Sequence, residues 1–519
     1  MFSSNQRFHQ RADVSAMTFF LFQCLKFLFR PYTKSFVVVS TAPRELFVVF
    51  IIAFLTSFGS TGSSSIMVSY FSDEFNYSDV EASTLFACSA ASYIIFGLFT
   101  GRLIDWIGLK KSFVVGAILG VIGSMTISLA WSREMLVFAV VFLLPLAMKF
   151  VVPVISIALK RLTYSENKRV SFAFSYIAGN IGAAFGYLYV DFVRFRFPTG
   201  VSFRSYSATS SRVIFMTGAA STLVCALFAM CWMRDIMVDE KGAIKEFSRN
   251  TNVTNEEVAQ NNRIDKRWYL TFREPNFIRM VVLSVIMFPL LKVFTHFDVT
   301  LPKAAVREFG SAVLFGTIKA VNPIMITFLQ LPVSDVFSYF HVYTMIIIGS
   351  TISALSVFIF CFPASNASWV TAFVIFTIGE MIFSHRVNDL ATDYMPNGRE
   401  GIYSSLMDIY LIAPRFIVDA FSGWLLSVYC PSVGERHCEI MWLIIGLMAC
   451  VTPVALFPAK GYLMAGLSMH KQNQPTEDEE RQNAVALEQI HNKKFVISDP
   501  TNDNDNATEI AKLEEELNK

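Results

Sequence analysis

The segment GRLIDWIGLKK, residues 101–111, lies between two apolar runs and decides the fold of this chain. Glycine lets a chain reverse and lets two backbones approach closely. A carboxylate at a helix end can accept hydrogen bonds from free N–H groups of a neighbouring helix, or pair with a base. Lysine holds a loop on the cytoplasmic side of a membrane. The segment therefore predicts a cytoplasmic turn between two membrane helices. Its defining residues are Gly101, Asp105, Gly108, Lys110 and Lys111.

The composition supports a membrane protein. Of the 519 residues, 54% are hydrophobic and 16% are charged, and the mean hydropathy is +0.48. Soluble proteins average about 25% charged residues, so this chain has too few to cover a surface that faces water. The net charge of +2 gives no reason to expect a nucleic-acid partner. The sequence contains no P-loop, metal-ligand spacing or nucleophile motif, so we predict neither an enzyme nor a metal or cofactor site.

Apolar runs near the length of a bilayer core recur along the chain. They predict an all-α, polytopic membrane protein with twelve transmembrane helices in two six-helix bundles. The expected helices cover residues 46–70, 82–101, 111–131, 135–159, 170–191, 212–232, 277–299, 312–334, 341–361, 368–386, 403–428 and 440–460. The expected parts are a basic interfacial amino terminus (1–44), a first bundle (45–233), a central loop (234–276), a second bundle (277–462) and a disordered acidic tail (463–519).

The turn at 101–111 resembles the signature of the major facilitator superfamily, and the six-plus-six arrangement agrees with it. The resemblance implies a transporter that works by alternating access. It also implies a solute site between the two bundles near the bilayer midplane. In that family the turn serves folding and conformational switching rather than solute recognition.

Charged loops predict the orientation. The basic amino terminus, the lysines of the turn and the loop at 160–169 place both termini in the cytoplasm. Residues 191–211 are also basic but would lie outside, either as a patch for anionic solutes or lipids or as a loop tolerated after the topology was set. Sequons at Asn76 and Asn366 fall in outer loops and could carry glycans. The membrane would be the plasma membrane or an endolysosomal or vacuolar membrane.

Ionisable residues inside the bilayer are costly and usually face a cavity or a partner. Lys149 and Glu380 lie well inside their predicted helices, one in each bundle. Desolvation opposes the charged form of such groups, which suits proton coupling. These two residues are therefore the leading candidates for solute or proton binding, and a structural salt bridge across the cavity is the alternative.

Other polar residues are secondary candidates. Lys319 and Asn322 lie three positions apart and share a helix face. Tyr176 and Asn180 could also point into the cavity. A stripe in helix 403–428 is either a neutralised ladder or a site, and a group at the outer end of helix 277–299 is expected to snorkel to the interface. The stripe is Asp408, Arg415 and Asp419, and the snorkelling group is Lys292, His296 and Asp298.

A second resemblance is narrower. Lys149, the segment SFAFSYIAGNIGA at 171–183, the pair Asn322 and Pro323, and Glu380 after glycine look like motifs of the proton-coupled oligopeptide transporters. The resemblance implies that Lys149 meets a carboxylate and that Glu380 meets an amine or a proton. The family's acidic-and-arginine signature is absent from helix 46–70, so a divergent relative for another small polar or charged solute is the alternative.

We therefore predict a proton-coupled symporter in the lipid bilayer for a small solute. A receptor or scaffold without flux and a lipid carrier of the same fold are the rivals. Cys430 and Cys438 share one polar loop and would form a disulfide if that loop faces an oxidising side. Helix 170–191 also carries a small-residue face for close packing, formed by Ala178, Gly182 and Gly186.

Overall fold

The computed structural model describes residues 42–203, 206–234, 236–238, 244–246, 272–337, 340–395 and 415–471, together with residues 32, 36, 39 and 40. Residues up to Pro458 form one compact unit and residues from Ala459 form a second. The helix packing and the site below belong to the first unit. The predictions of an amino-terminal interfacial helix, a long central loop and a disordered tail fall largely outside the described residues, as does Asp408.

The first half of the molecule consists of helices with two short hairpins. Each hairpin pairs its strands antiparallel. The helices are α2 (Arg44–Phe75), α3 (Asp79–Ile107), α4 (Leu109–Leu129), α5 (Arg133–Phe138), the π-helix η1 (Ala139–Leu143), α6 (Leu144–Arg161), α7 (Ser165–Arg196) and α8 (Ser210–Trp232). The strands are β1 (Val201–Phe203), β2 (Tyr206–Ala208), β3 (Ile236–Val238) and β4 (Ile244–Glu246).

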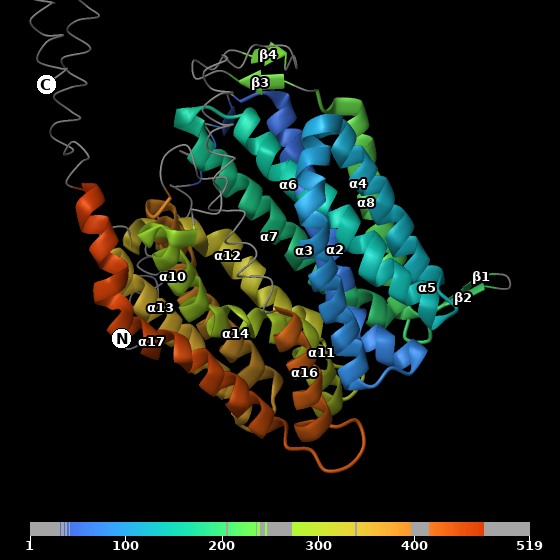
Figure 1. Ribbon diagram of the computed structural model, residues 1–519. Coiled ribbons are helices and arrows are strands. Elements are labelled where there is room, and N and C mark those ends of the chain that lie inside the picture. The colour runs from blue at the N-terminus through green and yellow to red at the C-terminus, as the bar shows by residue number, and fades with distance from the viewer. Residues whose placement is uncertain are drawn as a thin grey trace, which may run out of the picture. The chain divides into compact units, whose positions relative to one another are not determined.

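Within the described residues, the regular elements of the second half are all helices. Its elements are α10 (Pro275–Leu291), α11 (Val293–Phe309), α12 (Phe315–Phe337), α13 (Val342–Ser356), the 3-10 helix η3 (Val357–Cys361), α14 (Asn366–Asp393), α16 (Arg415–Tyr429) and α17 (Cys438–Lys471). Figure 1 shows the first half in blue to green and the second half in yellow to red.

The all-α membrane fold is confirmed. Each predicted helix overlaps a helix of the structure, and several ends differ by one to three residues, as at α12, which begins at Phe315. Within the described residues, nine helices are long and apolar enough to cross a membrane. Three of these spans are composite: α5, η1 and α6 continue one another over Arg133–Arg161, α10 and α11 over Pro275–Phe309, and α13 and η3 over Val342–Cys361. A total of twelve spans stays a prediction.

The turn at 101–111 is shorter than predicted. Helix α3 continues to Ile107, and Gly108 alone separates it from α4. Gly108 adopts a φ of 93°, which a residue with a Cβ rarely adopts. Lys110 is therefore helical, and its Nζ donates to the carbonyl oxygen of Met230 on α8 at 2.9 Å. The side chain of Asp105 lies outside the described part of the chain.

Helix α2 is the centre of the first half and packs against α7 and α8. Gly182 and Gly186 bring α7 against the carbonyl groups of Phe54 and Phe58, where a Cβ would clash with the α2 backbone. The predicted small-residue face on this helix is thus the face that contacts α2.

The two halves meet along three helix pairs: α7 with α12, α3 with α16, and α2 with α11. Close backbone approach makes two of these contacts possible. Gly316 of α12 lies against the carbonyl of Tyr187, and Gly423 of α16 lies against the carbonyl of Asp79. The loops divide between two ends of the helices, which we call the Asp79 end and the Gly108 end.

Candidate functional site

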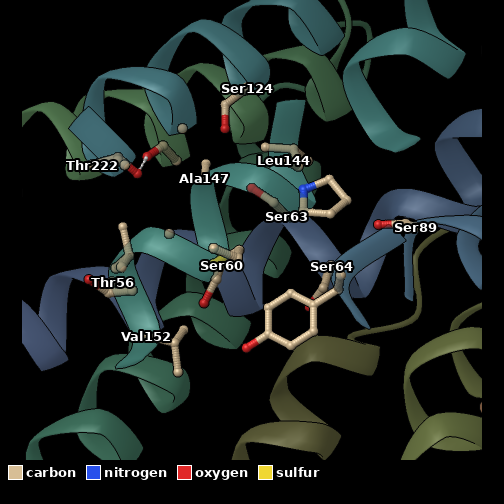
Figure 2. A pocket seen from close by; sticks show the side chains of 18 of the residues that line it. Thr56, Ser60, Ser63, Ser64, Ser89, Ser124, Leu144, Ala147, Val152 and Thr222 are labelled. Carbon is tan, nitrogen blue, oxygen red and sulfur yellow. Dashed lines mark hydrogen bonds between the residues drawn. The ribbon is translucent and has the colours of Figure 1, made fainter. Parts of the chain in front are cut away.

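A cavity of about 410 Å³ opens inside the first half, between α2, α3, α4, α6 and α8, and reaches α11 of the second half. Eight serine and threonine side chains line it, so we call it the hydroxyl chamber. Figure 2 shows most of them around one space. They are Thr56, Ser60, Thr61, Ser63, Ser64, Ser89, Ser124 and Thr222.

The sequence of α2 accounts for this lining. Thr56, Ser60, Ser63 and Ser64 follow one another at helical spacing and form one face of the helix. Opposite them, α4 presents glycine and alanine at 116, 117 and 120, which leave room for a cavity instead of filling it. The chamber therefore arises where small polar and small apolar helix faces meet.

The hydroxyl groups of the chamber differ in how they are bonded. Ser60, Ser64 and Thr222 donate to carbonyl oxygens of their own helices, at 3.4, 3.2 and 2.9 Å. The hydroxyls of a second set make no hydrogen bond with any described residue. This set consists of Thr61, Ser63, Ser89 and Ser124. The second set keeps donors and acceptors for a bound molecule.

Asp298 of α11 is the one charged side chain among the described lining residues. Lys319 of α12 neutralises it, with Nζ at 2.7 Å from Oδ1. The same Nζ lies 4.5 Å from the ring centre of Tyr187 on α7. An ion pair of the second half therefore meets the first half at the edge of the chamber.

The snorkelling predicted for the group at 292–298 is wrong. Lys292 and His296 are 8% and 2% exposed, and Asp298 faces the chamber. The helical segment continues through α11 to Phe309, so these residues lie within it rather than at its outer end. His296 Nδ1 bonds the hydroxyls of Thr300 and Ser422, at 3.2 and 3.1 Å.

Lys149 lies beside the chamber. Its Nζ is 3.8 Å from the ring centre of Tyr93, which lines the cavity. The lysine chain crosses Gly97 of α3, where a Cβ would meet Cε at 2.9 Å. The ammonium group is therefore held against an aromatic ring in a cation–π contact.

Glu380 occupies a separate polar cluster in the second half. Asn322 Nδ2 donates to Glu380 Oε2 at 2.6 Å and to the hydroxyl of Thr377 at 3.0 Å. Lys149 and Glu380 are both described, and no ion pair joins them. Lys319 and Asn322, which share a helix face, have different partners.

Tyr176 and Asn180 mark a contact of α7 with α14. The ring of Tyr176 lies edge-on to that of His385, with centroids 6.1 Å apart. Asn180 donates to the carbonyl of Tyr176 at 2.9 Å, so its amide bonds its own helix. Neither residue lines the hydroxyl chamber.

Charged contacts join the halves at the Asp79 end. Asp79 of α3 pairs with Lys303 and Arg307 of α11, each at 2.8 Å, and we call these three residues the Asp79 cluster. Arg307 uses one nitrogen for both carboxylate oxygens. Sequence reasoning missed this cluster, because its carboxylate and its cations are more than 220 positions apart.

A second contact at this end involves Asp191 of α7. Its carboxylate accepts from the backbone N–H of Gly316 at 3.0 Å and from that of Thr317 at 2.5 Å, at the start of α12. Arg194 donates to the carbonyls of Val313 and Ser311 at 3.1 and 3.0 Å. Asp191 thus satisfies free N–H groups at the amino terminus of a helix in the other half.

Two alternatives were open for the loop at 191–211, and the contacts of Arg194 and of Arg212 just beyond the loop do not favour a patch for anionic solutes. Arg194 bonds the second half as described, and Arg212 pairs with Glu74 at 2.6 Å. Arg212 also donates to the carbonyls of Ser128 and Ala130. These guanidinium groups join protein segments and are not left for a solute.

The structure shows where the residues of the predicted glycans, disulfide and charged stripe lie, and the roles of these residues stay predictions. Asn76 is exposed at the end of α2, and Asn366 is exposed at the first residue of α14. Cys430 and Cys438 are joined in a disulfide in the loop between α16 and α17. Asp419 is buried on α16, whereas the Arg415 side chain lies outside the described residues.

Helices that cross a membrane, two halves that meet along three helix pairs and a cavity between helices define the class of membrane transporters. A family model described as the Major Facilitator Superfamily matches residues 49–418. The chain belongs to this superfamily, as predicted. A search of curated proteins found no match.

Solved structures of similar fold are transporters. A POT family transporter in complex with 5-aminolevulinic acid has a TM-score of 0.61 at 16% identity, covering 81% of this chain and 97% of that one. Peptide transporter POT in complex with sulfate has a TM-score of 0.63 at 16% identity, with 82% and 96% covered. The nucleoside transporter NupG has a TM-score of 0.60 at 12% identity, with 80% and 99% covered. At these identities the likeness establishes the fold.

A signal for the chamber is present in the sequence of helix 46–70. Helix 46–70 contains no charge and offers serine, threonine and glycine, which marked it as lacking a known signature. Reading those hydroxyls at helical spacing would have placed Thr56, Ser60 and Ser64 on one face. Ser89, Ser124 and Thr222 come from three other helices and required the tertiary structure.

Proposed function

We propose that this chain is a secondary active transporter that moves a small polar or charged solute through a membrane by alternating access, coupled to protons. The observation that carries the proposal is the hydroxyl chamber, which the first half forms and to which the second half contributes Asp298. A cavity that includes both halves changes its access when the halves rock. The fold is that of secondary transporters, which supports the proposal.

The Asp79 cluster and the Asp191 contact close one end in this proposal. Both join the halves at the Asp79 end, and both must separate before that end can open. The turn around Gly108 would act at the opposite end as the conformational switch, with Gly101, Asp105, Lys110 and Lys111. The structure would therefore represent the state that is closed at the Asp79 end.

The proton would use buried polar residues of the second half. Glu380 with its partner Asn322 is the proposed proton acceptor, and the Lys319 and Asp298 pair is a second candidate. Lys149, held on the Tyr93 ring beside the chamber, would contribute to solute binding. Tyr176 and Asn180 would form the wall of the pathway along α7.

The titles of the similar structures support a small polar solute. They name a transporter in complex with 5-aminolevulinic acid, a peptide transporter and a nucleoside transporter. We extend to this chain the common property, which is a small molecule rich in hydrogen-bonding groups. The protein would be a symporter in which the bilayer and the proton are the other partners.

We also propose that both termini face the cytoplasm. The disulfide of Cys430 and Cys438 supports an oxidising compartment at the Asp79 end, because disulfides persist there. Exposed Asn76 and Asn366 lie at the same end and would carry glycans. The membrane would be the plasma membrane or an endolysosomal or vacuolar one.

Solute-driven proton flux tests the proposal. Purified protein in proteoliposomes with an internal pH dye receives dipeptides, amino acids, sugars and organic anions in turn. We expect acidification with one solute class and its loss in Lys149→Ala and Glu380→Gln. Glu435→Gln, an exposed carboxylate in the loop after α16, is the matched control and should keep the flux. No flux with any solute, in protein shown to be folded, would overturn the proposal.

A further inference from the structure

We propose that the hydroxyl chamber selects a neutral, polyhydroxylated solute, such as a sugar, a polyol or a nucleoside. The inference rests on the proposed transport function and names its substrate class. The volume of about 410 Å³ falls within the range of pockets that bury small ligands.

The chamber offers hydrogen bonds of the kind that a hydroxylated solute needs. A serine or threonine hydroxyl can donate one hydrogen bond and accept others, so it matches a hydroxyl of a ligand in either role. Thr61, Ser63, Ser89 and Ser124 make no hydrogen bond with the described residues around them. They come from three helices, α2, α3 and α4, so they approach a bound molecule from different sides.

The charge of the lining argues against a zwitterion. Asp298 is its one charged side chain among the described residues, and Lys319 already neutralises it at 2.7 Å. The ammonium group of Lys149 lies on the Tyr93 ring outside the lining. An ionised carboxylate or ammonium group of a solute would lose its hydration here without a counter-charge, which is costly.

The remaining walls suit the C–H surfaces of a hydroxylated solute. Phe86, Tyr93 and Phe113 contribute rings, and Leu144 and Val151 contribute aliphatic surface. Apolar walls with a few placed polar groups are the usual composition of a small-molecule site. A sugar or nucleoside presents both kinds of surface, whereas a simple organic ion presents mainly charge.

Isosteric variants separate hydrogen bonding from shape. Thr61→Val removes the hydroxyl and keeps the side-chain shape, whereas Thr61→Ser keeps the hydroxyl. Ser89→Ala removes a second unpartnered hydroxyl from another helix. Ser284→Ala is the matched control, because Ser284 is a buried serine on α10 that bonds its own helix and does not line the chamber.

The measurements are uptake into proteoliposomes and ligand-induced thermal stabilisation of the purified protein. The probes are D-glucose, D-sorbitol, uridine, dialanine and succinate. We expect uptake and stabilisation by one or more of the first three. We expect Thr61→Val and Ser89→Ala each to weaken the apparent affinity about 3- to 10-fold, as for the loss of one hydrogen bond. Thr61→Ser and Ser284→Ala should stay near the wild type.

Each other result has a defined meaning. Uptake of dialanine or succinate without the neutral probes would overturn this inference and leave the transporter proposal standing. Uptake of a neutral probe that Thr61→Val and Ser89→Ala leave unchanged would also overturn it, because the chamber would not be the site. Stabilisation by a neutral probe that these variants weaken, without any uptake, would support the inference and overturn transport. Neither binding nor uptake of any probe would overturn both.

Discussion

The two halves of the molecule hold their buried polar groups in different ways. In the second half, Lys319 is paired with Asp298 and Asn322 is bonded to Glu380. In the first half, Thr61, Ser63, Ser89 and Ser124 line a cavity without a hydrogen-bond partner among the described residues. A buried charge without a partner is costly, whereas a hydroxyl that faces a cavity can stay without a hydrogen-bond partner until a ligand binds. This difference fits the proposal that the first half recognises the solute and that the Lys319–Asp298 pair of the second half carries charge.

The largest expected effect comes from breaking the ion pair of the second half. Lys319→Met keeps much of the side-chain volume but leaves Asp298 without its counter-charge. Removing one partner of a buried pair costs about 3–5 kcal/mol, so we expect a much lower melting temperature for the purified protein in detergent. The double variant Lys319→Met with Asp298→Asn removes both charges and should recover much of the stability. Equal melting temperatures for the single variant and the wild type would contradict a structural ion pair.

The next effect concerns the contact between the halves. Asp79→Asn removes the charge that holds Lys303 and Arg307, and hydrogen bonds to charged groups contribute about 1.5–3 kcal/mol. Opening at the Asp79 end should therefore become more frequent. We expect hydrogen exchange in residues 310–317 and 197–209 to become about 10- to 100-fold faster, which corresponds to that free energy.

The control for this prediction is Glu439→Gln, which removes an exposed carboxylate at the same end that contacts His437. It should leave the exchange rates unchanged. If Asp79→Asn and Glu439→Gln behave alike, the Asp79 cluster does not hold the halves together.

A smaller effect is expected when the stabilities of two asparagine variants, one in each half, are compared. Asn322→Leu leaves the buried carboxylate of Glu380 without its donor, and an unsatisfied buried group costs about 1–3 kcal/mol. Asn180→Leu in the first half removes an amide that donates to the carbonyl of Tyr176 on its own helix. We expect thermal unfolding to show a clear loss for Asn322→Leu and a smaller one for Asn180→Leu. The reverse order would contradict the difference drawn between the halves.

The smallest effect is expected when the stabilities of two serine-to-alanine variants, one in each half, are compared. Ser89→Ala should change the free energy of unfolding by no more than about 0.5 kcal/mol, because its hydroxyl has no partner to lose. Ser353→Ala should cost about 1 kcal/mol, because Ser353 is buried and donates to the carbonyl of Phe376 at 2.9 Å. Thermal unfolding without added solute measures both. A large loss for Ser89→Ala would show that its hydroxyl supports the fold rather than a ligand.

The sequence predicted the fold better than the site. Apolar runs and the residues around Gly108 were sufficient for the helices and the superfamily, because both are local signals. The close packing of α7 also followed from the spacing of Gly182 and Gly186. The position of Asp298 at the chamber could not be predicted from the sequence. A polar residue near a predicted helix end has the same sequence pattern whether it snorkels or faces a cavity.

Charged residues show the same limit. The structure holds Lys149 on Tyr93 and Glu380 on Asn322, partners that the sequence did not identify, and the roles of both residues stay predictions. The sequence shows the sign of a side chain's charge and its depth along a helix. Which partner the side chain contacts depends on how its helix is rotated relative to the neighbouring helices. Partners from other helices decide that choice.

The sequence by itself determined an all-α membrane protein of this superfamily, because hydrophobic length and turn residues are read along one chain. Only the tertiary structure decided that hydroxyls from four helices surround one chamber and that Asp79 meets Lys303 and Arg307. The physical reason is that an ion pair or a cavity wall requires groups within a few ångströms. Residues separated by hundreds of positions reach that distance only through the packing of helices.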